Sequence, residues 1–237
     1  MMIVQKRVSK NKSPIYWEVA GMKQKISLIK PVEDYRLSFG TGGLYVIESG
    51  LLIQAYSFIK DWDNVIEDAA EQNLLQFKSK QSTRRAVREI CTRLKYMSQQ
   101  ELDFYLAADP FDQSLMCWLA CCRTYQFIGD FATQVLIENF ASYKLELRHA
   151  DFDFFFDEQA LFHPELEDLT EGTRKKLRQI LFRMMREAGV LTEDNRIVAG
   201  IASQSLKDIN DHAHRDLHLF VPGAVQWRST PLVLNLE

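Results

Sequence analysis

The sequence predicts a mainly α-helical protein: a multi-helix bundle with a helix-turn-helix-like N-terminal unit and a winged-helix-like C-terminal part with minor β-structure. Apolar residues recur at helical spacing, capping residues precede several of these segments, and the clearest β-prone pieces lie near 190–203. We expect a basic N-terminal extension at 1–34, a helical domain with the helix-turn-helix-like unit at 35–150, and a helical, winged-helix-like domain at 151–237.

Composition indicates an ordinary globular protein. The chain has 237 residues, of which 46% are apolar and 26% are charged, enough to bury a core. Its apolar runs are far shorter than the roughly 20 residues that span a bilayer, and its start lacks the apolar region of a secretory signal. We therefore expect a cytoplasmic protein with no membrane span. Its four cysteines fit reduced thiols rather than a disulfide framework.

The first two expected helices follow a basic N-terminal segment whose structure the sequence leaves open. Residues 1–30 fit either a strand pair or a flexible arm. Gly40, Gly42 and Gly43 are not followed by the Lys-Ser/Thr pair of a phosphate loop, so we interpret them as a flexible entry to a helix at 44–60. Its expected buried stripe is Leu44, Ile47, Leu51, Ala55 and Phe58, and Asp61 is expected to cap a second helix at 62–73.

The most informative stretch is 78–97, which carries seven Lys or Arg against one acid, Glu89. Ser82 is the expected N-cap of a helix that buries Ala86, Val87, Ile90 and Leu94. Arg84, Arg88 and Lys95 then line up beside this apolar face, with Arg85 further round. A row of cations on a fixed helix suits a polyanion, although a solvated helix face has the same pattern. The two preceding helices complete a helix-turn-helix-like outline, with a longer turn than usual.

Further helices are expected in the middle of the chain. Ser98 and Glu101 form a capping box for a helix through 108, which Pro110 ends. The apolar segment 112–143 predicts two core helices parted near Gly129 and Asp130. Cys117 and Cys121 have a spacing that suits a metal, but no partner ligands lie nearby, so we interpret them with Cys91 and Cys122 as core residues.

The stretch 151–171 mixes four phenylalanines with acids. A pair such as Asp151 and Asp153 could bind a cation or serve a nuclease, but no partner constellation supports catalysis. We interpret the acids as a solvated edge around a buried aromatic patch.

A second basic helix is expected from Thr173, its proposed cap, to Gly189, its C-terminal stop. Leu177 and Ile180 belong to its inner face, and Arg174, Lys175, Arg178 and Arg186 to its outer face. Two β-prone pieces around a turn at 193–195 follow, the order typical of a winged helix. His212, His214 and His218 suit zinc only if that segment is extended, so no metal or other cofactor is expected, and the tail with Trp227 is expected to pack on the body.

Charge is segregated along the chain although the net charge is only −3. Residues 1–30, 78–97 and 172–186 each carry +6, whereas 31–77, 98–171 and 187–237 carry −6, −12 and −3. We expect the three basic segments to share one face that binds double-stranded DNA largely through its phosphates. The candidate DNA-binding residues are Lys78, Lys80, Arg84, Arg85, Arg88, Lys95, Arg174, Lys175 and Arg178.

Several ordered blocks resemble one known family. They are YRLSFGTGGLYVIESGLLIQAY, DWDNVIEDAAEQNLLQ, STRRAVREICTRLKYMSQQEL, TRKKLRQILFRMMREAGVL and a late HLFVPG. Together, over about 35–223, they resemble the BrxA family of type I bacteriophage exclusion (BREX) systems. The resemblance implies a non-enzymatic, helical, double-stranded DNA-binding protein that acts beside PglX, PglZ, BrxC and BrxB. The alternative is a protein-only adaptor whose basic faces dock acidic surfaces of other BREX components.

Overall fold

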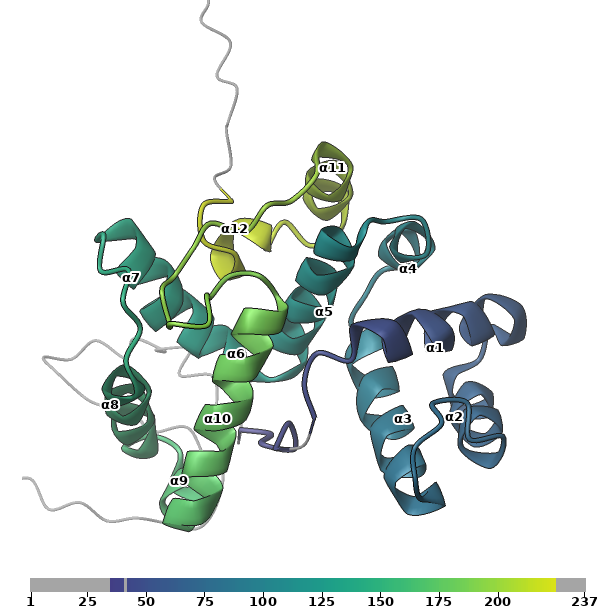
Figure 1. Ribbon diagram of the computed structural model, residues 1–237, viewed down its shortest axis with the longest axis horizontal. Coiled ribbons are helices and arrows are strands. Elements are labelled where there is room, and N and C mark those ends of the chain that lie inside the picture. Colours follow the sequence, from purple (N-terminus) through teal and green to yellow (C-terminus); the bar gives the residue numbers. More distant parts are fainter. Residues whose placement is uncertain (1–34, 41, 225–237) are drawn as a thin grey trace, which may run out of the picture. The chain divides into compact units, whose positions relative to one another are not determined.

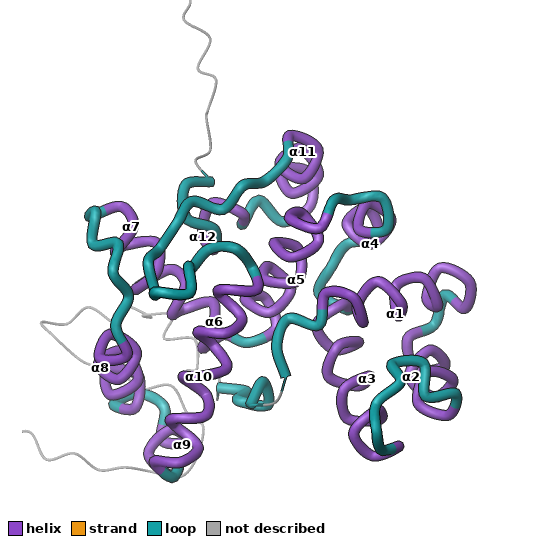
Figure 2. Tube along the Cα trace, viewed as in Figure 1, coloured by secondary structure: helices purple, strands orange, loops and turns teal. Residues whose placement is uncertain are grey.

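The computed structural model describes residues 35–40 and 42–224, all within one compact unit, Asp34–Glu237. The arm or strand pair expected at 1–30 and the packing expected of Trp227 lie outside the described residues. The described residues fold mainly into helices (Figures 1 and 2), which confirms the mainly α class. The first six are α1 (Val46–Ile59), α2 (Trp62–Glu71), α3 (Lys80–Leu94), α4 (Gln99–Tyr105), α5 (Pro110–Thr124) and α6 (Gln126–Phe131). A π-helical segment η1 (Ala132–Ile137) leads to α7 (Glu138–Ala141), α8 (His149–Ala160), α9 (Pro164–Glu167), α10 (Glu171–Glu187), α11 (Gln204–Ala213) and α12 (Leu217–Phe220).

Helix α5 is the centre of the core. It packs against α1, α3, α4, α6, α10 and α12 (Figure 1 shows where these helices lie). Its residues from Leu115 to Cys122 are all buried. Trp118 is completely buried, and its indole Nε1 donates a hydrogen bond of 2.8 Å to the carbonyl of Phe220. The continuous burial explains why this stretch is the most apolar of the chain.

The break in this apolar segment lies at Tyr125, not near Gly129 and Asp130 as the sequence predicted. Tyr125 has φ −115° and ψ 101°, an extended conformation between α5 and α6. Gly129 lies inside α6, where a Cβ atom would stand 2.9 Å from the carbonyl oxygen of Cys122. The glycine therefore permits close packing of α6 on α5 and does not end a helix.

Two of the predicted caps are confirmed. The carboxylate of Asp61 accepts a hydrogen bond of 2.8 Å from the amide of Asn64 at the start of α2. Ser98 and Glu101 form the predicted capping box of α4. The helix expected to run through 108 ends at Tyr105, and Pro110 is the first residue of α5, where its missing N–H costs no helical hydrogen bond.

The predicted buried stripe of α1 is wrong at three of its five positions, whereas Ala55 is partly buried against the core as predicted. Leu44 is buried just before the helix, but the helix itself buries Ser49, Leu52 and Ile53. Ile47, Leu51 and Phe58 point to solvent instead. Because α1 carries apolar residues on both sides, its periodicity does not identify the side that faces the core.

All four cysteines are free and buried, as predicted. Burial raises the pKa of the thiols of Cys91 and Cys121 to about 12. Cys117 Sγ lies 3.3 Å from the hydroxyl oxygen of Tyr105, and the Tyr105 O–H donates to the carbonyl of Val46. The Cys117 thiol thus lies between α5 and α4.

The hairpin expected after α10 is present in minimal form. Gly189 ends α10 with φ +70°, and single antiparallel bridges join Leu191 to Ile197 and Glu146 to Arg196. Over 35–40 and 42–224, no longer β-ladder forms. The winged-helix-like interpretation therefore remains a prediction. Among these residues no helix combines the length and the apolar character needed to cross a bilayer.

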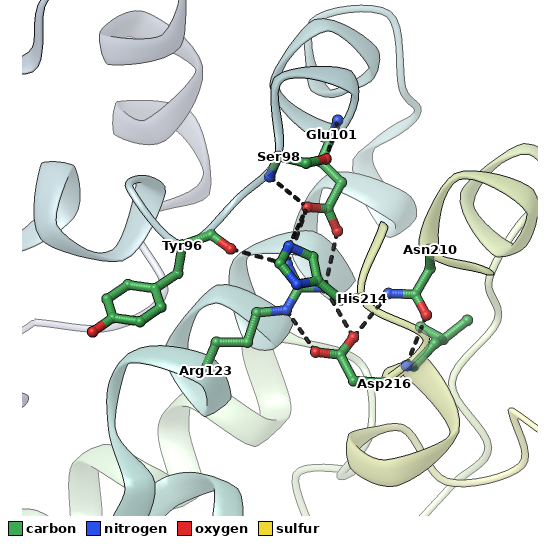
Figure 3. A network of polar contacts seen from close by, with 8 residues as sticks. Tyr96, Ser98, Glu101, Arg123, Asn210, His214 and Asp216 are labelled. Carbon is green, nitrogen blue, oxygen red and sulfur yellow. Dashed lines mark hydrogen bonds and ion pairs between the residues drawn. The ribbon is translucent and has the colours of Figure 1, made fainter. Parts of the chain in front are cut away.

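A buried ionic network joins α4, α5 and the α11–α12 corner (Figure 3). The Arg123 guanidinium donates to Asp216 at 2.7 and 2.9 Å and to Glu101 at 2.9 and 3.2 Å, and its side chain is 7% exposed. Asn210 donates to Asp216 at 2.8 Å, and His214 Nε2 lies 3.3 Å from Glu101. Burial opposes the charge of Asp216, but hydrogen bonds from Arg123 and Asn210 lower the pKa of its carboxyl.

Replacing Arg123 should destabilise the protein strongly. Arg123→Met leaves Glu101 and Asp216 buried without their cation, which costs about 3–5 kcal/mol of unfolding free energy. Urea denaturation at neutral pH measures the loss. Arg183→Met is the control, because Arg183 is 61% exposed in its pair with Glu187 and should change stability by less than about 1 kcal/mol.

The pH dependence follows from the lowered pKa of Asp216. A carboxyl with a depressed folded pKa stabilises the protein above its unfolded pKa, and this contribution disappears as pH falls through the folded pKa. We expect the difference between wild type and Arg123→Met to shrink as the solution is acidified below the usual carboxyl range. A difference that stays constant over that range would contradict this assignment.

Candidate nucleic-acid interface

Helix α3 is held by one apolar side. Ala86, Val87, Ile90, Cys91 and Leu94 are buried, as the sequence predicted, and α3 packs against α1, α2 and α5. The packing leaves the opposite side of the helix to solvent.

The start of α3 lies three residues earlier than predicted. Ser79, not Ser82, is the N-cap, and its hydroxyl accepts a hydrogen bond of 3.1 Å from the amide of Ser82. The Thr83 hydroxyl donates to the Asn73 side-chain oxygen at 2.5 Å, and Asn73 has φ +50°. This contact ties the first turn of α3 to the link that follows α2.

The C-terminal half of α3 is fixed by Arg93, which is 2% exposed. Its guanidinium donates to the Glu89 carboxylate at 2.9 and 3.1 Å and to the Gly43 carbonyl at 2.8 Å. It also lies over the rings of Tyr45 and Tyr125, with centroid distances of 5.7 and 5.6 Å. One of the seven cations of the basic stretch is thus a structural residue and is unavailable to a ligand.

The outer face of α3 carries Arg84, Arg85 and Arg88, and all three are exposed. Within the described part of the chain, no carboxylate lies within 4.0 Å of their guanidinium nitrogens. Lys78 and Lys80 are exposed at the N-terminal end of the helix. Lys95, at the other end, pairs with Asp63 at 3.1 Å, and its side chain remains 44% exposed.

The predicted cations of α10 have different surroundings. The helix begins at Glu171 with Thr170 as its cap, so the predicted cap Thr173 is wrong and instead donates its amide to Thr170. Lys175, on the predicted outer face, is exposed.

Arg174 and Arg178 lie at the edge of that face and turn toward α8. Arg174 donates to Asp157 at 2.6 Å and lies 4.5 Å from the ring centroid of Phe156. Arg178 donates to Asp153 at 2.5 Å, and Arg174 lies 3.4 Å from the same carboxylate. The acids of α8 therefore pair with α10 rather than form only a solvated edge.

Helices α3 and α10 both form hydrogen bonds to the short segment that precedes α1. Arg93 of α3 contacts the Gly43 carbonyl, and Glu187 of α10 accepts a hydrogen bond of 2.6 Å from the Leu44 amide. These contacts join the C-terminal ends of the two helices, whereas most of the predicted DNA-binding residues lie in their N-terminal halves. The basic segment 1–30 lies outside the described residues.

The three histidines that were considered as zinc ligands belong to different segments of the structure. His212 belongs to α11, His214 follows its end and His218 belongs to α12. Within 35–40 and 42–224, no group of three or more His, Cys, Asp or Glu is placed to hold a metal ion.

These features define a mainly α-helical protein with an exposed row of arginines on the third helix of a three-helix unit. A model of the BrxA family matches residues 33–211, most of the chain. The chain belongs to the BrxA family, whose members are components of BREX phage defence.

The fold also resembles the crystal structure of an uncharacterized protein from Magnetospirillum magneticum. The TM-score is 0.68 at 18% identity, over 80% of this chain and 98% of that one. A comparison with curated proteins finds no match.

The position of the cap of α3 can be tested by a matched pair of variants. Ser79→Ala removes the hydroxyl that accepts from the first turn and should cost about 1 kcal/mol of unfolding free energy. Ser82→Ala keeps that acceptor and should cost much less. Urea denaturation of both variants measures the difference, and a larger loss for Ser82→Ala would reject Ser79 as the cap.

Proposed function

We propose that this BrxA-family chain is a non-enzymatic, double-stranded DNA-binding component of BREX that contacts DNA phosphates through the outer face of α3. The observation that carries the proposal is the state of Arg84, Arg85 and Arg88. They are exposed on one side of a helix that is fixed at both ends.

Among the described residues these arginines form no ion pair, which is informative because the chain contains many acids. It holds 32 Asp and Glu, and many of its other arginines engage one. Arg93, Arg123, Arg174, Arg178 and Arg183 all form such pairs. Three neighbouring guanidinium groups left without carboxylates repel one another mildly, and a polyanion relieves that repulsion.

The position of α3 also supports binding to a duplex. Helices α1, α2 and α3 pack together, and α3 is the last of the three, as the recognition helix is in helix-turn-helix units. The link at 72–79 is longer than the usual three or four residues, so we propose the likeness for the arrangement of the helices and not for the turn. Lys78 and Lys80 add charge at the N-terminal end of α3, where the helix dipole also favours phosphate.

The α10 residues have a smaller part in the proposed interface. Lys175 is exposed and can contact phosphate directly. Arg174 and Arg178 would first have to exchange Asp153 and Asp157 for DNA. The proposed interface therefore centres on α3, with Lys175 as an auxiliary contact.

Phosphate contacts of this kind give an affinity that depends little on sequence and falls steeply with salt. Each neutralised phosphate contributes roughly 0.9 to the log–log salt slope. We propose that the chain acts beside the other BREX components PglX, BrxB, BrxC and PglZ while it holds DNA.

Replacing the three arginines should weaken DNA binding in a characteristic way. The triple variant Arg84→Ala, Arg85→Ala, Arg88→Ala should lower the log–log salt slope for a duplex by about 3 and weaken binding to all sequences alike. A gel-shift titration at several salt concentrations measures both quantities. Circular dichroism should show an unchanged fold, because the three side chains are exposed.

A charge-matched control comes from exposed cations on other elements. Lys144→Ala, Lys207→Ala and Arg215→Ala together remove the same charge and should leave the salt slope nearly unchanged. An equal effect of the two triple variants would mean that only net charge matters and would reject α3 as the interface. A wild-type protein that shifts no duplex at low salt would favour the protein-only adaptor.

The non-enzymatic part of the proposal has its own test. Incubation of the wild-type protein with supercoiled plasmid and magnesium should leave the plasmid intact. Nicking that is lost in Asp151→Asn or Asp153→Asn would establish a nuclease instead.

A further inference from the structure

The outer face of α1 is apolar although it faces solvent. Ile47 is 80% exposed, Phe58 is 81% exposed and Leu51 is 37% exposed. At 100° per residue, these three and the exposed Gln54 fall within an arc of about 60°. They form one stripe, which we call the α1 stripe: Ile47, Leu51, Gln54 and Phe58.

The composition of α1 is unusual for a helix at a surface. Its 14 residues include a single charged one, Glu48, and its inner side already buries Ser49, Leu52 and Ile53. A surface helix normally carries charged and polar residues, not large apolar ones, on the side away from the core. The α1 stripe therefore lacks a covering group among the described residues.

Helix α2, which packs against α1, carries exposed acids. Asp61 and Asp63 begin α2 a few residues after Phe58, and Glu67, Asp68 and Glu71 are also exposed on α2. Residues 46–71 hold six acids and one cation, Lys60. Lys95 pairs with Asp63, whose side chain remains 86% exposed.

This charge indicates what kind of group covers the stripe. DNA is repelled by the acids of α2, and a second copy of the same surface would bring acid against acid. A protein helix with apolar residues on one side could cover the apolar stripe. Lys or Arg residues flanking that apolar side could pair with the acids of α2. The α1 stripe runs over 12 residues, from Ile47 to Phe58, and the 11 steps of about 1.5 Å between them correspond to roughly three turns of such a helix.

We propose that the α1 stripe docks a basic amphipathic helix of another BREX component. The contact differs from the proposed DNA interface, because α3 packs on α1 with its inner side and carries Arg84, Arg85 and Arg88 on its outer side. One three-helix unit would thus bind DNA with α3 and a protein with α1.

The test places a photo-crosslinking analogue on the stripe. Phe58 is replaced by p-benzoylphenylalanine in the full chain, in cells that express the complete BREX operon. Its high exposure means that the fold tolerates the change. We expect a crosslink to another BREX protein within a helix that carries Lys or Arg beside apolar residues. Adding Ile47→Glu should reduce the crosslink at least tenfold.

Tyr143 provides the matched control, since it is 88% exposed and lies after α7. The same analogue at position 143 should give no crosslink to that helix. The proposal is overturned if the analogue at position 58 joins a second copy of this chain, residues 1–34 of its own chain or an acidic peptide. It is also overturned if crosslinking at position 58 does not exceed that at position 143.

The outcome is separable from the proposed function. Ile47→Glu should reduce the crosslink from position 58 and keep the gel shift with duplex DNA. The triple alanine variant of α3 should keep the crosslink and weaken the gel shift. Loss of the crosslink in the α3 variant would overturn the assignment of the contact to α1.

Discussion

The buried charge of Arg93 is the constraint on which the orientation of α3 depends. An unpaired guanidinium in the interior would be very costly, and this one is satisfied by Glu89, the Gly43 carbonyl and the rings of Tyr45 and Tyr125. At 100° per residue, Arg93 lies about 180° from Arg84 around the helix. Satisfying Arg93 therefore turns Arg84 to solvent. Arg93, which is buried and unavailable to DNA, thus determines the direction of Arg84, which is proposed to bind DNA.

The sequence predicts helix positions well and helix starts less well, for a reason visible at two sites. In α3 and α10, two hydroxyl residues stand three apart, Ser79 with Ser82 and Thr170 with Thr173. In each case the first is the cap and the second donates its amide to it. Either residue fits the preference for caps, so propensity alone does not choose between them. Where an acid is also correctly placed, as Glu101 is after Ser98, the prediction is confirmed.

Contacts between distant segments are what the sequence could not provide. The periodicity of α10 places Arg174 and Arg178 on its polar side, but only the fold brings Asp153 and Asp157 of α8 to them. The periodicity of α1 likewise predicts that Ile47, Leu51 and Phe58 face the core, because both sides of this helix carry apolar residues. For α3, one side is apolar and the other is charged, so its buried residues and its exposed arginines were both predicted correctly.

The four thiols of the chain have a practical consequence. All of them are buried, and the high pKa of Cys91 and Cys121 keeps these thiols protonated at neutral pH. Maleimide dyes and thiol-reactive spin labels react with accessible thiolates, which attack them as nucleophiles. A single cysteine introduced at the surface would therefore take up a label without prior removal of the native ones. The protein is thus well suited to distance measurements by fluorescence or electron paramagnetic resonance inside larger assemblies.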